Sequence, residues 1–326
     1  MTELYLEVDE QVINLNQSRV QTFLRCHRKY GWFYHEGLTP DRPTYALSFG
    51  TAVHAALAEV ASGKLKMDAA LAHGIEVFKK QMPEGKFPGD EVIVNEHIEL
   101  MERMLPAYYA HYEHDHNPWK PIGLEVAGRV EIGTDTNVFL VFRTDELALQ
   151  DKLLWIVDHK TAARLDPRDM LKYEMDLQMT AYTYAITKKL TQESGRPVRV
   201  AGVIVNVLVK TAAPQFHRER FIRTDEELEE FEHEFVEIAR EIRWRHQRVK
   251  DGEDWKQVFY KNTNECFSYG TCYFRDLCLK DNPIRRMAYI PRKKDYVDDP
   301  SILQKTGESR KDPLGPKDEK EAVGGG

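Results

Sequence analysis

The stretch Leu153-Leu154-Trp155-Ile156-Val157-Asp158-His159-Lys160 carries the strongest fold signal in this chain. An unbroken run of apolar residues is typical of a strand that is buried on both faces, and here an acid and a lysine follow it. Because side chains alternate along a strand, Asp158 and Lys160 are expected on one side and His159 on the other. The stretch therefore predicts a polar site at the end of a buried sheet.

A second acid, Asp145, lies on the preceding strand-like run, and Gln150-Asp151 are predicted to turn the two runs into a hairpin. Two neighbouring carboxylates repel each other unless a cation lies between them, and Mg²⁺ or Mn²⁺ is the expected cation. The backbone carbonyl of His159 could complete part of the metal shell. Lys160 could hold the attacking water, or deprotonate it if its surroundings lowered its pKa. A phosphodiester is the matching substrate, since the metal would neutralise charge on the phosphoryl oxygens. An isolated pair such as Asp158 and Lys160 can equally be a solvated ion pair.

Composition sets limits on the partners. The chain has 326 residues, 42% hydrophobic residues and a net charge of -7. This content predicts a real core in one large domain or two small ones. No stretch approaches the roughly 20 apolar residues of a membrane span, and residues 1–16 lack signal-peptide features. We therefore expect no association with a membrane. The expected location is the cytoplasm, or the host cytoplasm for a viral protein. Any DNA site must be a local basic patch, and the candidates are Arg25, Arg28 and Lys29, residues 240–250 and residues 285–294.

Periodicity predicts an α/β protein in which a mixed sheet is flanked by helices. The predicted helices are 18–34, 49–61, 67–81, 91–114 with an interruption at Pro106, 169–190, and one that begins with a capping box of Thr224 and Glu227. The predicted strands are 124–132, 137–142, 144–149, 153–159, 200–209 and 216–222. These elements suggest a helical N-terminal part (1–121), a sheet-bearing core (122–223), a helix with a cysteine segment (224–290) and a disordered tail (291–326).

The cysteines are few and clustered. Cys26 stands alone, whereas Cys266, Cys272 and Cys278 recur every six residues. In a reducing compartment such clusters are more often metal ligands than disulfides. Zinc sites usually draw on cysteines two to four residues apart, so the wider loops favour a 4Fe-4S cluster, with Zn²⁺ as the alternative. With Cys26 as fourth ligand, the group would close a loop of about 240 residues and have a structural role.

Several motifs together resemble the PD-(D/E)xK nuclease superfamily, in its RecB-like branch with an iron-sulfur cluster. This branch includes the nuclease domains of bacterial recombination complexes and the CRISPR adaptation nucleases. The resemblance covers most of residues 18–278 and includes the split of one cysteine before the core and three after it. The motifs that carry it are Gly50-Thr51-Ala52-Val53-His54, Asp145, Asp158-His159-Lys160-Thr161 and Gln178-Met179-Thr180-Ala181-Tyr182.

The resemblance implies a restriction-endonuclease-like core and assigns roles to single residues. His54, Asp145 and Asp158 would bind the metal, together with the carbonyl of His159. Lys160 would be catalytic, and Gln178 and Tyr182, which share a helix face, would support the site or the DNA.

One departure leaves alternatives open. The family often has a glycine three residues before its first aspartate, whereas this chain has Phe142-Arg143-Thr144-Asp145. Asp151 or Glu146 could therefore be the ligand instead of Asp145, although Asp151 sits in the presumed turn and Glu146 points away if Asp145 points in. Glu125 could support the site from a neighbouring strand or be a surface residue.

The function expected from these features is a metal-dependent DNA nuclease, in particular an exonuclease in recombination, repair or viral DNA processing. A helicase or recombination protein is a conceivable partner, but the chain has no G-x-x-x-x-G-K-[ST] phosphate loop of its own. The alternative is a noncatalytic iron-sulfur DNA-binding subunit of a larger nuclease complex.

Overall fold

The computed structural model describes residues 12–42, 44–82, 89–134, 136–268 and 270–293. The strands are β1 (Ile13–Leu15), β2 (Leu38–Pro40), β3 (Lys120–Glu131), β4 (Val138–Gln150), β5 (Leu153–Ala162), β6 (Val200–Val209), β7 (Gln215–Ile222) and β8 (Tyr289–Pro291). The α-helices are α1 (Gln17–Arg25), α2 (His27–Tyr30), α3 (Tyr45–Ala61), α4 (Met67–Lys80), α5 (Asp90–His111), α6 (Pro167–Leu171), α7 (Leu177–Ser194), α8 (Asp225–Lys250), α9 (Trp255–Val258), α10 (Arg275–Leu279) and α11 (Pro283–Arg286). A π-helix spans Gly31–His35, and 3₁₀ turns span Lys172–Met175 and Thr263–Cys266.

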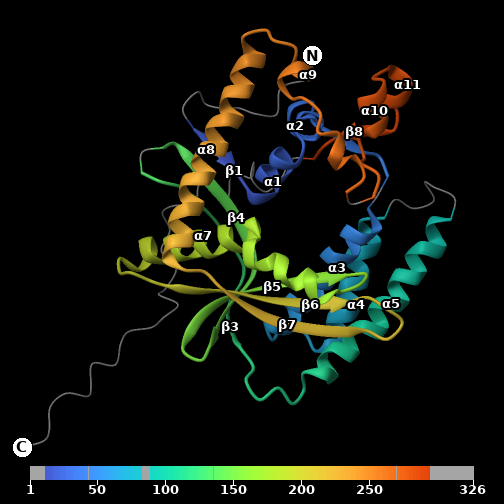
Figure 1. The fold of residues 1–326 in the computed structure, drawn as a ribbon. Helices are drawn as coiled ribbons and strands as arrows, with labels where there is room; N and C mark the ends of the chain where they lie inside the picture. The colour runs from blue at the N-terminus through green and yellow to red at the C-terminus, as the bar shows by residue number, and fades with distance from the viewer. Residues whose placement is uncertain (1–11, 43, 83–88, 135, 269, 294–326) are drawn as a thin grey trace, which may run out of the picture.

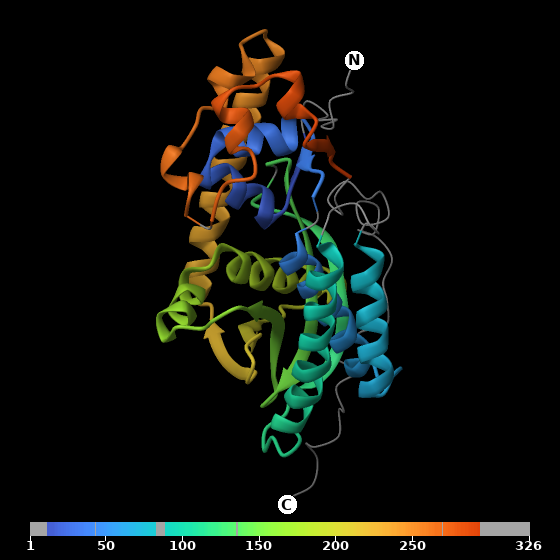
Figure 2. The same ribbon diagram turned by 90° about the vertical axis from the view of Figure 1, so that its right-hand side faces the viewer.

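The main sheet is mixed, as predicted. Its order is β1-β4-β5-β6-β7, and β3 also pairs with β4. β4 runs antiparallel to β5, whereas β5 and β6 are parallel neighbours. Helices α7 and α8 lie on one side of the sheet, and α3, α4 and α5 lie on the other (Figures 1 and 2). This arrangement confirms the predicted α/β class.

Each side of the sheet has its own apolar packing. On the side of α7 and α8, Ile156 of β5 and Val205 of β6 pack in one cluster with Ile186 and Phe235. On the other side, Leu208 packs with residues of α3, α4 and α5. Full burial of such a side chain contributes about 1.5–3 kcal/mol, so these two layers hold the strand ends in place.

The hairpin between β4 and β5 is tighter than predicted. Gln150 pairs directly with Leu153, so the turn consists of Asp151 and Lys152. Both turn residues have positive φ, 52° and 63°, as a two-residue type I′ turn requires. The predicted break at Arg143 is also wrong, because β4 is continuous and Arg143 is only an exposed residue within it.

Two predicted helices are broken where tertiary contacts require it. Cys26 adopts an extended conformation (φ −160°, ψ 111°) and separates α1 from α2. Asp176 is likewise extended, and its side chain caps α7 by accepting the N–H groups of Gln178 and Met179. The predicted interruption at Pro106 is wrong, since α5 continues through it. A proline removes one intrahelical hydrogen bond, and the buried face of α5 compensates for this loss.

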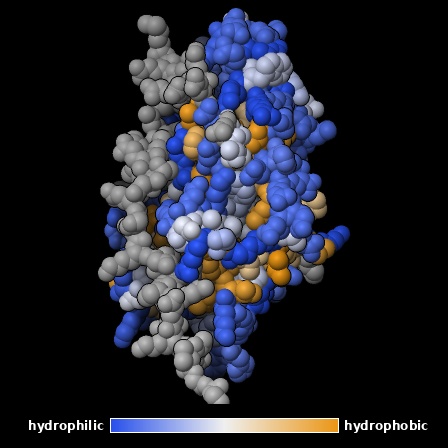
Figure 3. Space-filling view, turned by 90° about the vertical axis from the view of Figure 1, so that its left-hand side faces the viewer, coloured by the Kyte–Doolittle hydropathy of each residue, from blue (hydrophilic) through white to orange (hydrophobic). Residues whose placement is uncertain are grey.

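The capping box of Thr224 and Glu227 is confirmed at the start of α8. Pro291, where the predicted tail begins, instead ends β8, which pairs antiparallel with β2. The C-terminal segment therefore lies beside the N-terminal helices, as the orange and blue ribbons show in Figure 1. Residues 294–326 of the predicted tail lie outside the described residues. None of the described helices has the length and apolarity to cross a membrane. The face seen in Figure 3 is mostly hydrophilic, with small apolar areas between.

Candidate active site

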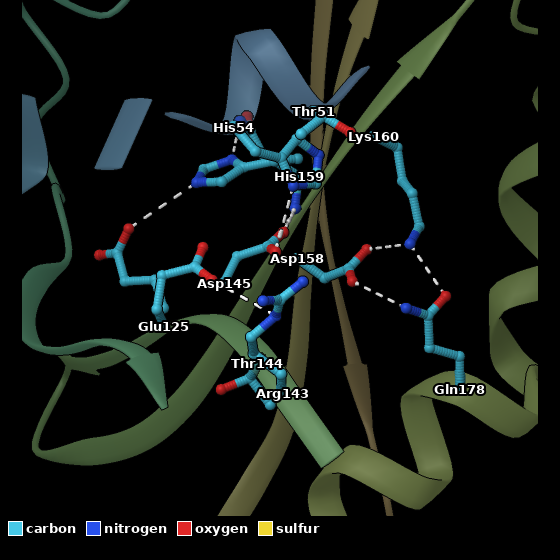
Figure 4. A network of polar contacts seen from close by, with 12 residues as sticks. Thr51, His54, Glu125, Arg143, Thr144, Asp145, Asp158, His159, Lys160 and Gln178 are labelled. Atoms are coloured by element: carbon cyan, nitrogen blue, oxygen red, sulfur yellow. Dashed lines mark hydrogen bonds and ion pairs between the residues drawn. The ribbon is translucent and has the colours of Figure 1, made fainter. Parts of the chain in front are cut away.

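Asp145 and Asp158 come together through the register of the hairpin. Glu146 of β4 lies opposite Val157 of β5, so one further step of the same register brings Asp145 to Asp158. Asp145 and Asp158 share a side of the sheet with Lys160, because side chains alternate along both strands. Figure 4 shows these three side chains gathered with His54 of α3 and Gln178 of α7. The structure thus brings together residues predicted from four separate motifs.

Asp145 is held from two directions. Its Oδ1 lies 3.1 Å from His54 Nδ1, and its Oδ2 accepts the backbone N–H of His159 at 2.9 Å. Burial raises the pKa of Asp145, but His54 and the His159 N–H outweigh this effect and lower the pKa below its usual range. Burial lowers the pKa of His54, but the charge of Asp145 more than compensates, so that the net shift is upward. Asp145 is therefore an ionised carboxylate.

Asp158 is more enclosed than Asp145, since 3% of its side chain is exposed compared with 21% for Asp145. Its Oδ2 lies 2.7 Å from Lys160 Nζ, and Gln178 Nε2 donates weakly to its Oδ1 at 3.4 Å. Burial raises the pKa of Asp158, and the nearby charge of Asp145 adds to this effect, although Lys160 opposes it. The two carboxylates therefore repel each other.

Lys160 is a charged donor in this setting. Burial lowers the pKa of its amine, but the carboxylate of Asp158 outweighs burial and raises the pKa above its ordinary value. Its Nζ also donates to Gln178 Oε1 at 2.9 Å. Lys160 would need a lowered pKa to act as a base, and its surroundings raise the pKa instead. The geometry instead supports an ammonium group that can orient a neighbouring oxygen.

Gln178 and Tyr182 lie one turn apart on α7 and act as a unit. Gln178 Nε2 donates to the hydroxyl of Tyr182 at 2.9 Å, and Gln17 Nε2 donates to the same hydroxyl at 3.1 Å. Tyr182 is buried, so its hydroxyl contacts these two amides and is not accessible to a ligand from solvent. It fixes the amide that holds Lys160.

The alternatives to Asp145 point elsewhere. Glu146 is buried on the opposite side of the sheet, where Trp119 Nε1 donates to its Oε1 at 2.7 Å. Asp151 lies in the turn and accepts from Asn117 Nδ2. Neither carboxylate faces Asp158.

Glu125 of β3 lies next to the site, because the register of β3 and β4 brings it opposite Asp145. Its φ is 48°, which is rare for a residue other than glycine, and such strain clusters at functional sites. Burial raises the pKa of Glu125, although Arg143, at 3.5 Å, opposes the shift. Glu125 is therefore a neighbour of Asp145 and not an isolated surface acid.

The donor set suits a divalent cation in its chemistry. Two carboxylates repel each other across one face, and the buried Oδ2 of Asp158 has no hydrogen-bond donor beyond its ion pair with Lys160. Within the described ranges, however, no three His, Cys, Asp or Glu side chains are arranged around a common ion. His54 engages Asp145, and Lys160 engages Asp158. The predicted metal roles, including that of the His159 carbonyl, remain predictions.

The four cysteines meet at one cavity of about 200 Å³, which Cys26, Cys266, Cys272 and Cys278 all line. All four thiols are free. Trp32 Nε1 lies 3.3 Å from Cys278 Sγ, and the amide of Asn262 lies 3.4 Å from Cys26 Sγ. Burial raises the pKa of the Cys272 and Cys278 thiols. The predicted set is thus assembled from both ends of the chain.

Two predicted basic patches are weaker than their sequence suggested. Arg28 is buried, and its Nε donates to the carbonyl of Phe259 at 2.7 Å, so it cannot contact a phosphate. On α8, three arginines are paired with acidic neighbours, namely Arg240 with Glu237, Arg245 with Glu241 and Arg248 with Glu253.

Sequence reasoning missed Gln17 and Asn206. Asn206 is fully buried and is the only polar side chain in β6, Val200–Val209. A polar residue in an apolar strand requires hydrogen-bond partners, so its position was a usable signal. Gln17 carries no comparable signal, because a glutamine at the start of a helix is ordinary.

Fold and site together define a nuclease-type α/β core. The profile of the PD-(D/E)XK nuclease superfamily matches residues 14–279, and the chain belongs to this superfamily. Among solved structures, it is similar to a candidate exonuclease from Eubacterium rectale, with a TM-score of 0.46, 16% identity and coverage of 91% of this chain and 97% of the other. A second similarity, to SSO0001, has a TM-score of 0.26, 11% identity and coverage of 59% of this chain and 72% of the other. Both likenesses are weak, and the family assignment rests on the profile match alone. No curated protein matches the chain.

Proposed function

We propose that this protein is a metal-dependent DNA nuclease. The observation that carries the proposal is the gathering of Asp145, Asp158 and Lys160 on one side of the β4–β5 hairpin in a member of a nuclease superfamily. An ionised carboxylate, a second carboxylate in repulsion with it and an ammonium group are side chains that can support metal-assisted phosphodiester hydrolysis.

Asp145 and Asp158 would hold the cation, with His54 at the outer side of Asp145. When bound, Mg²⁺ or Mn²⁺ supplies a Lewis acid for the phosphoryl oxygens. Lys160 holds its charge next to Asp158 and orients an oxygen near the scissile bond. Gln178 keeps the Lys160 chain extended toward that position through its 2.9 Å hydrogen bond.

The cation that the site itself offers to a polyanionic substrate is Lys160, whose ammonium group lies 2.7 Å from Asp158 Oδ2. The net charge of -7 makes such local cations more important than the overall field.

The test is cleavage of end-labelled DNA with Mg²⁺ or Mn²⁺ added after treatment with a chelator. We expect wild-type cleavage that depends on the metal and a loss of at least about 100-fold in Asp158→Asn, because the amide cannot supply the same charge. Asp251→Asn, at the exposed C-terminal end of α8, is the matched control and should retain full activity. Metal-independent cleavage, or full activity in Asp158→Asn, would refute the proposal.

The finer prediction of exonuclease action is tested with closed circular DNA in the same assay. An exonuclease requires an end, so the circle should remain intact while the linear substrate is degraded. Cutting of the circle would identify an endonuclease at the same site.

We also propose that the four cysteines hold a 4Fe-4S cluster. The proposal is supported by the wide spacing of Cys266, Cys272 and Cys278 and by a cavity of about 200 Å³ that all four thiols line. The group would join the N-terminal helices to the C-terminal segment. Protein purified anaerobically should contain about four irons and absorb visible light, and Cys26→Ser should lose both properties. One equivalent of zinc without iron would reject the cluster in favour of the alternative.

A further inference from the structure

We propose that Asn206 and His159, on the opposite side of the sheet from the candidate active site, position Asp145 for metal binding. The inference rests on the proposed function. Both residues are buried, and register places them side by side on the parallel strands β5 and β6. Asn206 has no contact with the candidate metal-binding carboxylates, and the His159 ring meets the site only through an edge contact with the His54 ring, at a centroid distance of 6.0 Å, so we treat both as positioning residues.

The same strand segments serve both sides of the sheet. Asp145 faces the active site, while the next residue, Glu146, faces away. On β5, Asp158 and Lys160 face the active site, while His159 between them faces away. Any shift of the side chains behind the sheet therefore moves the backbone that carries the catalytic groups.

The hydrogen bonds of Asn206 set the tautomer of His159. Arg218 Nε donates to Asn206 Oδ1 at 3.1 Å, and a guanidinium can only donate, so the oxygen of the amide must face Arg218. The amide nitrogen then faces His159 Nδ1 at 2.8 Å and donates to it. Nδ1 accepts, so the ring proton is on Nε2, which points toward Glu146 Oε2 at 3.8 Å.

The fixed imidazole ring of His159 restrains the peptide group of the same residue, and this peptide group contacts the active site. The backbone N–H of His159 donates to Asp145 Oδ2 at 2.9 Å, and His54 holds the other oxygen of the carboxylate. The orientation of Asp145 thus depends on the His159 peptide, whose side chain is held between Asn206 and Glu146. Outer partners that orient metal ligands typically change metal affinity 10- to 100-fold when altered.

The substitution Asn206→Asp tests this link with little change in shape. A carboxylate still accepts from Arg218, but it cannot donate to His159 Nδ1. The Nδ1 atom of the imidazole can then no longer accept a hydrogen bond from residue 206. This change in hydrogen bonding loosens the His159 peptide group that holds Asp145. We expect Mn²⁺ binding, measured by calorimetry on the full chain, to weaken by about 10-fold.

Gln150→Glu is the matched control. Gln150 is also a buried amide on the same side of the sheet, and its Oε1 accepts from Arg220 Nε at 3.0 Å. It lies at the turn end of β4 and has no contact with His159. The variant carries the same change from amide to carboxylate, so it should bind Mn²⁺ as wild type does.

Each outcome decides the proposal. Unchanged Mn²⁺ affinity in a folded Asn206→Asp variant, or an equal loss in Gln150→Glu, would overturn it. Should Asn206→Asp not fold, Glu146→Gln tests the same ring from β4, since its amide oxygen can still accept from Trp119, and unchanged Mn²⁺ affinity there would also reject the link. Wild-type protein that binds Mn²⁺ without cleaving DNA would refute the proposed nuclease and leave this positioning role standing.

Discussion

Lys160 Nζ lies 2.7 Å from Asp158 Oδ2 in a site where 3% of the Asp158 side chain is exposed. A carboxylate so enclosed depends on its partner, because removal of one member of a buried pair leaves an uncompensated charge. The pair is therefore both a structural contact and the candidate catalytic centre.

Replacement of Lys160 by methionine should separate these two roles. We expect Lys160→Met to reduce metal-dependent cleavage by at least about 100-fold, since it removes the ammonium group that orients the reacting oxygen. The free energy of unfolding should change less than the activation free energy of cleavage, because Asp158 can take up a proton when its partner is lost. Cleavage rates and urea titrations measure the two effects. The control is Lys80→Met, since the Lys80 side chain is exposed on α4. A comparable loss of activity in this variant would contradict a specific role for Lys160.

Tyr182→Phe should affect stability and activity together. The hydroxyl accepts from the amides of Gln17 and Gln178, and both donors would lose a buried partner. We expect a loss of about 1–3 kcal/mol in the free energy of unfolding and a fall of about 10-fold in cleavage rate. Tyr289→Phe removes a hydroxyl that donates to the Tyr273 carbonyl at an exposed position and should cost less. Equal stability of the two variants would argue against the Tyr182 network.

His246 should make the fold sensitive to acid. Burial lowers its pKa to about 3 from an ordinary value of 6.5, with the charge of His35 as the next cause. Below pH 6.5 the unfolded chain binds a proton that the folded chain does not, so this contribution to stability is lost as pH falls toward 3. From pH 7 to pH 5 the loss should be about 2 kcal/mol.

Urea titrations of His246→Gln at pH 7 and pH 5 measure this contribution. The variant should show a smaller loss of stability on acidification than the wild type. His114→Gln, at an exposed position, should retain the wild-type pH dependence. An unchanged pH dependence in His246→Gln would show that other groups cause the acid sensitivity.

The turn between β4 and β5 offers a gain in stability. Lys152 has a φ of 63°, a region that costs an L-residue about 1–2 kcal/mol and glycine almost nothing. Lys152→Gly should therefore raise the free energy of unfolding by up to about 1 kcal/mol. The same change at exposed Lys79, within the right-handed helix α4, should lower it by about 0.5–1 kcal/mol. Destabilisation by both substitutions would contradict the turn geometry.

Much of the site was predictable because it rests on local rules. The alternation of side chains along β5 placed Asp158 and Lys160 on one side and His159 on the other, as the structure has them. The same rule directs Glu146 away from Asp145. Turn boundaries were less predictable, since Asp151-Lys152 has no asparagine or glycine to announce a type I′ turn.

Sequence by itself determined the alternating pattern of the strands, the capping box of α8 and the order of the acidic and basic motifs, because these depend on steric periodicity and on hydrogen bonds between near neighbours. Only the tertiary structure decided that His54 meets Asp145, that Asn206 contacts His159, and that Cys26 leaves the helix to join cysteines 240 or more residues later. Such contacts join residues far apart in the chain, and their geometry follows from how whole helices pack on the sheet, which no local pattern encodes.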